Sequence, residues 1–552
     1  MRKSMMHNFA HVPAPKIQRS RFDRSANWNG TFDEGQLIPM YCEEIIPGDM
    51  FNVRANIFAR MTSALVVPAM TNMILHTYFF FVPNRLVWDN FQKFMGEQDD
   101  PSDSIDYLLP VIDVSALGAG GFAAETYADY LGIPPSVGGS YDVQAIPFRC
   151  INLIYNEWFR DQNTQAKVPA LKDDGPDSYA AYSTVYRINK YHDYFTSALP
   201  WPQKGTAPIV PIGDSAPIIG LGPVRTSITS AITGAQTSLK AFNTDGSTIS
   251  TDRPMSASSA GIGYNTGSTL NLSQGIYPNN LWVDADLTNS TLAADLSQAV
   301  GASVNDVRAA FQYQRLLEAF ARSGTRYTEI VQNLFGVYSS DARLQRPEIL
   351  GVGSQRININ PTVQTSESNT TPQGTLAAYG TSIGNRHGFA RSFTEHGWVI
   401  GLMAVKTDLQ YQQGLHRKWS RQTRDDLYWP QYAHLGEQAI LNKEIYLQGS
   451  AGGTDDDEVF GYQERYGEMR YKESIITSRM RSSFPTSLDV YHTAQEFGSL
   501  PVLGYTFSQE NAPIDRIVAV SSEPHFICDI WFNESCARPM PVYGVPGMID
   551  HF

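Results

Sequence analysis

Cysteine is scarce in this 552-residue sequence, which contains only Cys42, Cys150, Cys528 and Cys536. These four are too few and too scattered for a disulfide framework or a zinc cluster, so each is expected to be a small buried apolar side chain. Such usage favours folding in a reducing cytoplasm. The fold is therefore expected to depend on its apolar core, for which 42% hydrophobic and 12% aromatic residues are available.

Long apolar runs are missing as well. The most apolar stretch, NMILHTYFFFVP, is interrupted by His76 and Thr77 and is much shorter than the roughly 20 residues that span a bilayer. The basic N-terminal residues are followed by histidines, prolines and Lys16 instead of the apolar run of a secretory signal. The sequence predicts neither a transmembrane segment nor a secretory signal.

Positive charge is limited, because 42 lysines and arginines stand against 55 aspartates and glutamates, a net charge of −13. This balance argues against nucleic-acid binding over the whole surface, since phosphate contacts need concentrated Lys and Arg. The first 25 residues are an exception, because their single acid is Asp23. Their six cations are Arg2, Lys3, Lys16, Arg19, Arg21 and Arg24. A basic arm of this kind is typical either of a nucleic-acid contact or of a solvated tail.

Sequence patterns predict β-strands near both ends of the chain. In residues 51–61, apolar side chains alternate with asparagines and arginines, which indicates a half-buried strand. Residues 73–82 are apolar on both faces and are expected to be covered on both sides. Further strands are expected at 396–411, 515–520 and 525–532.

Two amphipathic helices interrupt the β pattern. Pro147 occupies a favoured first helical position and is followed by apolar residues at helical spacing up to Phe159. The second helix is expected to begin after Ser303, a favoured N-cap with Asp306 three positions later, and to end at Gly324.

The strongest change of composition lies at residues 205–305, which are rich in Ser, Thr, Gly, Ala and Asn and lack Glu. Apolar residues recur throughout this stretch, which favours a surface insertion with short strands and turns over a disordered linker. Loops of this length usually carry recognition.

Catalytic motifs are missing from the sequence. The acidic run 455–458 lacks the ligand spacing of an EF-hand and is interpreted as a solvated loop. His387 and His396 do not form a zinc motif, and the glycines of AGIGYNTG miss the dinucleotide fingerprint. No nucleophile elbow or pair of acid and base carboxylates stands out. We therefore predict a protein without enzymatic activity, cofactor or metal site.

Longer motifs carry a more specific signal. The chain resembles the major capsid protein of microviruses, the small icosahedral single-stranded DNA phages, in the stretches TFDEGQLIPMYCEEIIPGDMFNVRANIFARM, PFRCINLIYNEWFRDQN, AFARSGTRYTEIVQNLFGV, FGYQERYGEMRYKES and ARPMPVYGVPGMIDHF. The resemblance covers nearly the entire chain apart from the insertion. The long insertion is similar to that of the gokushovirus-like branch.

This resemblance implies a mainly β fold, an eight-stranded antiparallel jelly roll of the viral capsid type with long inter-strand insertions that contain a few helices. Four segments are expected. They are a basic arm and lead-in at 1–36, the first part of the jelly roll with helical insertions at 37–204, the surface insertion at 205–305, and a helical segment with the remainder of the jelly roll at 306–552. In gokushovirus-like members such an insertion forms protrusions at the three-fold axes.

The resemblance also implies a structural function in the virion. About 60 copies would assemble, in the cytoplasm of the host bacterium, into a T=1 icosahedral capsid around a circular single-stranded DNA genome. The other implied partners are a small basic DNA-binding phage protein, a DNA pilot or minor capsid protein, an internal scaffolding protein and a host surface receptor. The insertion would serve host attachment, and the six cations of the arm would touch phosphates inside the shell.

Contacts between subunits need large side chains, which are typically aromatic or Arg. The sequence offers seven candidates, namely Trp88, Trp158, Trp419, Trp429, Tyr462, Arg465 and Arg470. The aromatic residues are equally suited to core packing. The two arginines are equally suited to exposed ion pairs worth under about 1 kcal/mol.

Two other classes of protein are alternatives to a capsid subunit. A β-rich carbohydrate-binding or carbohydrate-active protein would share the aromatic content and the Ser/Thr/Gly-rich loops, but it predicts a monomer with a paired-carboxylate cleft. A phage spike or tail fibre would show fibrous repeats or coiled-coil heptads, and the sequence shows neither.

Overall fold

The computed structural model describes residues 18–139, 141–208, 218–220, 255–258, 261–264, 292–294, 304–337, 346–369 and 372–543. The chain forms two compact units, one made of Met1–Lys204 and Leu317–Phe552 and the other of Gly205–Leu316. In the second unit, two short antiparallel pairs are described. They are β8 (Ile218–Gly220) with β11 (Leu292–Ala294), and β9 (Met255–Ser258) with β10 (Gly261–Tyr264). Most of the expected insertion at 205–305 lies outside the described residues.

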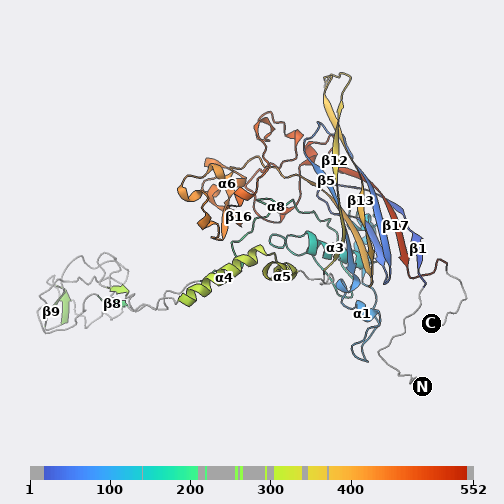
Figure 1. Ribbon diagram of the computed structural model, residues 1–552, viewed down its shortest axis with the longest axis horizontal. Coiled ribbons are helices and arrows are strands. Elements are labelled where there is room, and N and C mark those ends of the chain that lie inside the picture. Colours follow the sequence, from blue (N-terminus) through green and yellow to red (C-terminus); the bar gives the residue numbers. More distant parts are fainter. Residues whose placement is uncertain are drawn as a thin grey trace. The chain divides into compact units, whose positions relative to one another are not determined.

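The first unit is built on a nine-stranded antiparallel sheet. Its strands are β1 (Ser20–Asp23), β2 (Ala26–Phe32), β3 (Ile38–Ile45), β4 (Met50–Met61), β5 (Met73–Pro83), β12 (Glu348–Val363), β13 (Leu376–Ser392), β14 (Gly397–Thr407) and β17 (Phe526–Arg538). They pair in the order β1-β17-β4-β13-β12-β5-β14-β3, and β2 also pairs with β17. The sheet curls around a shared core (Figure 1). The expected mainly β fold is confirmed, and the strand order is consistent with a jelly roll whose halves meet at the β12–β13 pairing.

Strand β4 confirms the alternation expected at residues 51–61. Its buried and exposed residues alternate without exception, so that Phe51, Val53 and Ile57 enter the core while Arg54 and Arg60 face outward. Burial of such side chains contributes about 1.5–3 kcal/mol each. A slip of one residue would expose the whole apolar set, so the burial pattern fixes the register against β13 and β17.

Strands β5 and β14 are covered on both faces, as expected for residues 73–82. Phe79 and Val399 point into the core enclosed by the curled sheet. Phe80 and Ile400, one position further along, point into a second core on the opposite face. Both strands pair along their full lengths, and this central position explains why their sequences are apolar almost throughout.

The helix expected after Pro147 is confirmed and covers this second core. It is α3 (Ile146–Ile154), with Pro147 in its first turn, and it continues as a π-helical turn at Tyr155–Phe159. The expected second helix is α4 (Val304–Arg322), which is followed by α5 (Tyr327–Phe335). The remaining short helices of the described chain are α1 (Phe91–Phe94), α2 (Tyr127–Tyr130), α6 (Asn442–Ile445), α7 (Gly467–Arg470) and α8 (Tyr505–Ser508).

A third core lies away from the sheet, where β15 (Glu437–Leu441) pairs with β16 (Val459–Glu464). Ile440 and Phe460 from these strands pack with Tyr194 and Phe507. A last short pair consists of β6 (Val111–Asp113) and β7 (Asp142–Gln144). No helix in the described part of the chain has both the length and the apolar composition needed to cross a membrane.

The prediction of a strand at residues 515–520 is wrong. Residues Ile514–Arg516 form a 3-10 turn, and Val518 makes only an isolated bridge with Leu65. Ile514, Ile517 and Val518 are nevertheless buried in the core of the sheet. The apolar residues of this run are therefore buried as part of a loop. The turn leaves too few extended residues to pair with a neighbouring strand.

The cysteines behave as expected of small apolar residues. Cys150, Cys528 and Cys536 are buried, Cys42 is partly buried, and all four thiols are free. Burial raises the pKa of the Cys42 and Cys528 thiols to about 12, so both stay protonated and unreactive near neutral pH.

Candidate interaction surfaces

The basic arm enters the sheet at β1. Arg2, Lys3 and Lys16 lie outside the described residues. Arg19 donates to the carbonyl of Gly48, and Arg24 forms ion pairs with Glu43 at 2.6 Å and Glu534 at 3.3 Å. Arg21 is exposed, and its Nε donates to Ser535 Oγ at 2.7 Å. The Arg24 charge is therefore already compensated within the subunit, whereas the Arg21 charge is exposed to solvent and interacts with the Asp23 carboxylate at the surface.

Trp88 and Trp158 lie inside the subunit. Trp88 is fully buried, and its Nε1 donates to Asp174 Oδ1 at 2.7 Å. Trp158 is partly buried in the second core, donates to the carbonyl of Pro347 at 2.9 Å and is covered by Arg346 at 3.9 Å. Burial leaves Trp88 no exposed surface for a neighbouring copy.

Trp419 and Trp429 belong to an exposed stretch, residues 419–435, which we call the aromatic segment. Trp419 is 71% exposed. The other large apolar residues of the segment that are well exposed are Leu427, Tyr428, Trp429 and Leu435. Five large, exposed apolar side chains within one short stretch mark a candidate interaction surface.

Local hydrogen bonds hold the aromatic segment in shape. Trp429 Nε1 donates to the carbonyl of Arg424 at 3.0 Å, and the Trp429 amide donates to Tyr466 Oη at 3.2 Å. The Tyr428 and Tyr466 rings meet edge to face, 4.9 Å apart. Tyr428 and Trp429 are therefore held in place before any partner binds, which lowers the entropy cost of association.

The three remaining candidates have partners within the same chain. Tyr462 exchanges two 2.7 Å backbone hydrogen bonds with Leu199. Arg465 lies over the Tyr432 and Tyr466 rings, and Arg470 pairs with Glu464 at the surface. Both arginines thus have partners inside the subunit, and the exposed Arg470–Glu464 pair contributes little to stability.

Strand pairing creates a further surface that no single stretch of sequence reveals. Alternate residues of β1, β17, β4 and β13 face outward, away from the curled core. We call this the arginine face, and it contains Arg21, Asp23, Asn52, Arg54, Asn56, Phe58, Arg60, Ile383, Arg386, Asp529, Trp531 and Asn533. The sequence predicted the outward side of β4 only. The alternation within FICDIWFN would have indicated the matching residues of β17.

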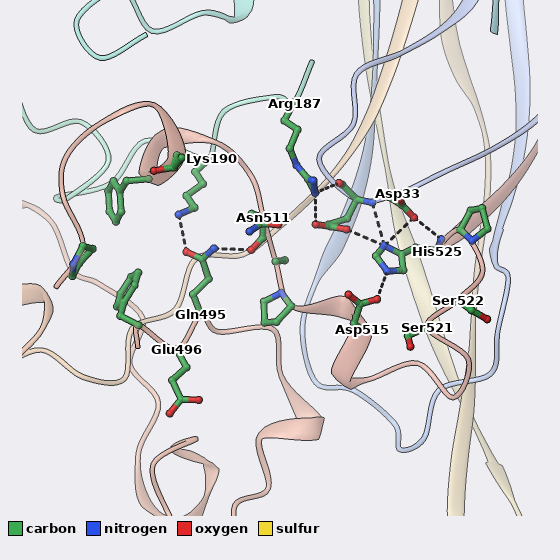
Figure 2. A pocket seen from close by; sticks show the side chains of 18 of the residues that line it. Asp33, Arg187, Lys190, Gln495, Glu496, Asn511, Asp515, Ser521, Ser522 and His525 are labelled. Atoms are coloured by element: carbon green, nitrogen blue, oxygen red, sulfur yellow. Dashed lines mark hydrogen bonds and ion pairs between the residues drawn. The ribbon is translucent and has the colours of Figure 1, made fainter. Parts of the chain in front are cut away.

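A polar cleft of about 730 Å³ lies where the loop before β17 meets the sheet (Figure 2). Figure 2 shows His525 beside Asp33 and Asp515. Its Nδ1 lies 2.9 Å from Glu34 Oε2, and its Nε2 lies 3.0 Å from Asp515 Oδ1. Arg187 also donates to Glu34 at 2.7 Å. Burial disfavours the charged imidazole, but the hydrogen bonds that its two N–H groups donate to the Glu34 and Asp515 carboxylates outweigh burial and raise the pKa of His525 to about 9.

Because the pKa of His525 is raised on folding, its stabilising contribution should be complete below about pH 6.5 and should disappear as pH rises through about 9. Asp515 is 71% exposed, so water screens part of the interaction. We expect His525→Gln to lower the free energy of unfolding by about 1–2 kcal/mol at pH 6 and to have little effect at pH 10. Chemical denaturation at both pH values measures this, with the exposed His434→Gln as control. An equal loss at both pH values would contradict the ionic explanation.

Three candidate metal ligands of the sequence form hydrogen bonds or ion pairs with protein groups. Asp456 accepts backbone hydrogen bonds from Gln448 and Gly449, and Asp457 lies 2.6 Å from Lys443 Nζ. Buried His387 hydrogen-bonds with Thr77 at 2.7 Å and Gln355 at 3.0 Å. Among the residues that the structure describes, no group of three or more His, Cys, Asp or Glu is arranged to hold a metal ion.

Comparisons with known proteins agree along the whole chain. Residues 10–548 match the family described as "Capsid protein (F protein)". The chain is 46% identical to capsid protein VP1 of Bdellovibrio phage phiMH2K, over 99% of this chain and 98% of the relative. It is 39% identical to capsid protein VP1 of Chlamydia phage 1, over 99% and 98%, and 36% identical to that of Spiroplasma virus 4, over 98% of each. Because these matches extend over nearly the full length of each chain, the protein belongs to the F-protein family of phage capsid proteins.

Proposed function

We propose that this protein is the major subunit of a small T=1 icosahedral capsid that encloses a circular single-stranded DNA genome. Its place in the capsid protein family carries the proposal. As a capsid protein it is structural and not enzymatic, it assembles with copies of itself, and it resides in the virion. The family leaves no support for the alternative of a carbohydrate-active protein.

The aromatic segment is the surface we assign to contacts between subunits. Trp419 and Trp429 are its central residues, because both are large, exposed and held in an ordered loop. Aromatic side chains of this kind contribute most of the energy at protein interfaces. Trp88 and Trp158 instead stabilise the subunit. Arg465 lies over the Tyr432 ring of the segment, whereas the partners of Tyr462 and Arg470 lie elsewhere in the subunit.

The basic arm is assigned to the interior of the shell, where its cations would touch phosphates without sequence preference. The arm holds six cations and one acid, a net charge of 6 − 1 = +5, so a complete set of about 60 copies would supply only on the order of 300 net positive charges. A genome of thousands of nucleotides carries far more phosphates, so a separate small basic phage protein is proposed to neutralise the bulk of them. A DNA pilot protein and an internal scaffolding protein complete the proposed partners.

Residues 205–305 are proposed as a surface protrusion at the three-fold axes that contacts the host receptor. Their composition supports this role, and so does the compactness of the first unit without residues 205–316. Lys204 donates its backbone amide to Leu317 at 3.4 Å, so the body of the subunit is closed on itself where the insertion leaves it.

Electron microscopy of the expressed protein, with and without residues 205–305, tests the proposed function. A Gly/Ser linker of about ten residues spans about 17 Å and can replace the insertion. We expect closed particles from both proteins and host-cell attachment only from the complete one. A persistent 61.3 kDa monomer of the complete chain under all assembly conditions would contradict the capsid function. Loss of particles on deletion, or attachment that survives deletion, would contradict the protrusion.

A further inference from the structure

We propose that the arginine face is a binding surface for single-stranded DNA, which holds phosphates with Arg21, Arg54, Arg60 and Arg386 and stacks a base on Trp531. This inference rests on the proposed function, since a capsid subunit must have a surface that meets its genome. It goes beyond the basic arm, because it places the contact on the folded sheet.

The register of the strands places these side chains beside one another. Trp531 of β17 stands opposite Asn56 of β4, and Asn533 stands opposite Arg54. On the other side of β4, Thr381 of β13 stands opposite Arg60. Neighbouring strands lie about 4.8 Å apart, and the seven residues from Arg54 to Arg60 span about 20 Å. The surface is therefore long and wide enough for several nucleotides.

Three of the four arginines of this face are unpaired within the described chain, and the fourth, Arg21, interacts with the nearby Asp23 carboxylate. Arg54, Arg60 and Arg386 are exposed, and within the described chain none of them forms an ion pair or a side-chain hydrogen bond. Other arginines of the same sheet behave differently. Arg391 pairs with Glu348 and Arg538 with Asp49. In a chain of net charge −13, cations left unpaired together indicate an anionic partner.

Two acids share the face, and they leave an excess of positive charge. Asp23 accepts hydrogen bonds from the hydroxyl and amide of Ser25, which lower the pKa of its carboxyl group. Asp529 stands opposite Phe58 on the neighbouring strand. Four arginines against two aspartates keep the surface basic, and the exposed asparagines add neutral groups able to bond to bases.

Exposed aromatic rings point to a single strand instead of a duplex. Trp531 is 46% exposed and Phe58 41% exposed, although both belong to central strands of the sheet. Trp531 Nε1 donates to Asn533 Oδ1 at 2.9 Å, which fixes the ring over the sheet. An intact duplex offers phosphates but keeps its base faces stacked, whereas a single strand offers both. Arginines interleaved with aromatic rings are the usual composition of single-strand binding surfaces.

Equilibrium binding of the purified full-length protein to a fluorescent single-stranded oligonucleotide tests the proposal, with a duplex of equal length as comparison. Each phosphate contact contributes about 0.7 to the logarithmic salt dependence, or about fivefold in affinity at 0.1 M salt. We therefore expect the double variant Arg54→Gln, Arg60→Gln to bind about 25-fold more weakly and to lower the salt slope by about 1.4. Trp531→Ala should weaken single-strand binding about tenfold and leave the slope unchanged.

The matched control replaces two exposed cations outside the arginine face, Lys472→Gln with Arg481→Gln, and should change affinity less than about twofold. Neither side chain forms an ion pair with the residues that the structure describes. Equal weakening by this control would overturn the proposal, as would duplex binding as tight as single-strand binding or an unaffected Trp531→Ala variant.

Electron microscopy of the same variants distinguishes the DNA-binding proposal from the proposed capsid function. Particles that form without retaining the genome support the arginine face. Loss of particles with unchanged oligonucleotide binding would show that the arginine face is a subunit contact and would overturn the DNA-binding proposal. Wild-type protein that forms no particles would instead contradict the capsid function.

Discussion

Replacing Arg149 by methionine is expected to lower the free energy of unfolding of the subunit by about 3–5 kcal/mol. The Arg149 side chain is completely buried, and its Nε and Nη2 donate to the two carboxylate oxygens of Asp177 at 2.8 and 2.5 Å. Its Nη1 donates to the carbonyls of Val87 and Asp173 at 3.1 and 2.8 Å. The variant would leave the buried Asp177 carboxylate without its cation and both carbonyls without this donor, and each loss costs desolvation energy.

The effect should be large because Arg149 joins α3 to two loops that cover the second core. Urea denaturation of the isolated subunit measures it. The control is Arg424→Met, since Arg424 is 82% exposed and only 3.8 Å from Asp425, and we expect it to change stability by less than about 0.5 kcal/mol. Adding Asp177→Leu to Arg149→Met should recover part of the loss, because the unpaired charge is then removed. A loss under about 1 kcal/mol for Arg149→Met alone would contradict the assigned role.

Much of the sheet could be predicted because the pattern of apolar residues in each strand matches the burial of its two faces. β4 alternates because one of its faces is exposed to solvent, and β5 is apolar at most positions because both of its faces are covered. The same reasoning failed at 515–520, where Ile517 and Val518 are buried side chains of a loop. Apolar residues report burial, and only a sufficient length of them distinguishes a strand from a loop that enters the core.

The interaction surfaces were less predictable, because residue type does not separate the surface from the core. Trp88 and Trp419 looked equivalent in the sequence, yet one is fully buried and the other is 71% exposed. The His525 site needs Glu34, which lies 491 residues away in the chain. The arginine face likewise exists only once β17 and β13 are placed beside β4. Such long-range pairings leave no mark on local sequence patterns.

Replacing Trp419 and Leu427 by serine is expected to prevent particle formation while leaving the subunit folded. Both side chains are more than half exposed in the aromatic segment, so neither replacement opens a cavity in the core. Interface residues of this kind contribute about 2 kcal/mol each, and a loss of about 4 kcal/mol raises the protein concentration needed for association by roughly a thousandfold. Thermal unfolding of the variant should match that of the unassembled wild-type subunit.

The serine variants of Val502 and Val520 make the matched control, because these side chains are also exposed and apolar but lie outside the aromatic segment. We expect this control to assemble at the wild-type concentration in light scattering and electron microscopy. Particles from the Trp419 and Leu427 variant at that same concentration would show that the aromatic segment is not a subunit contact. In a closed shell every copy presents the same surface. A modest loss of binding energy in one contact is therefore repeated in each copy. For this reason, replacing these two side chains should impair assembly far more than it lowers the stability of the subunit.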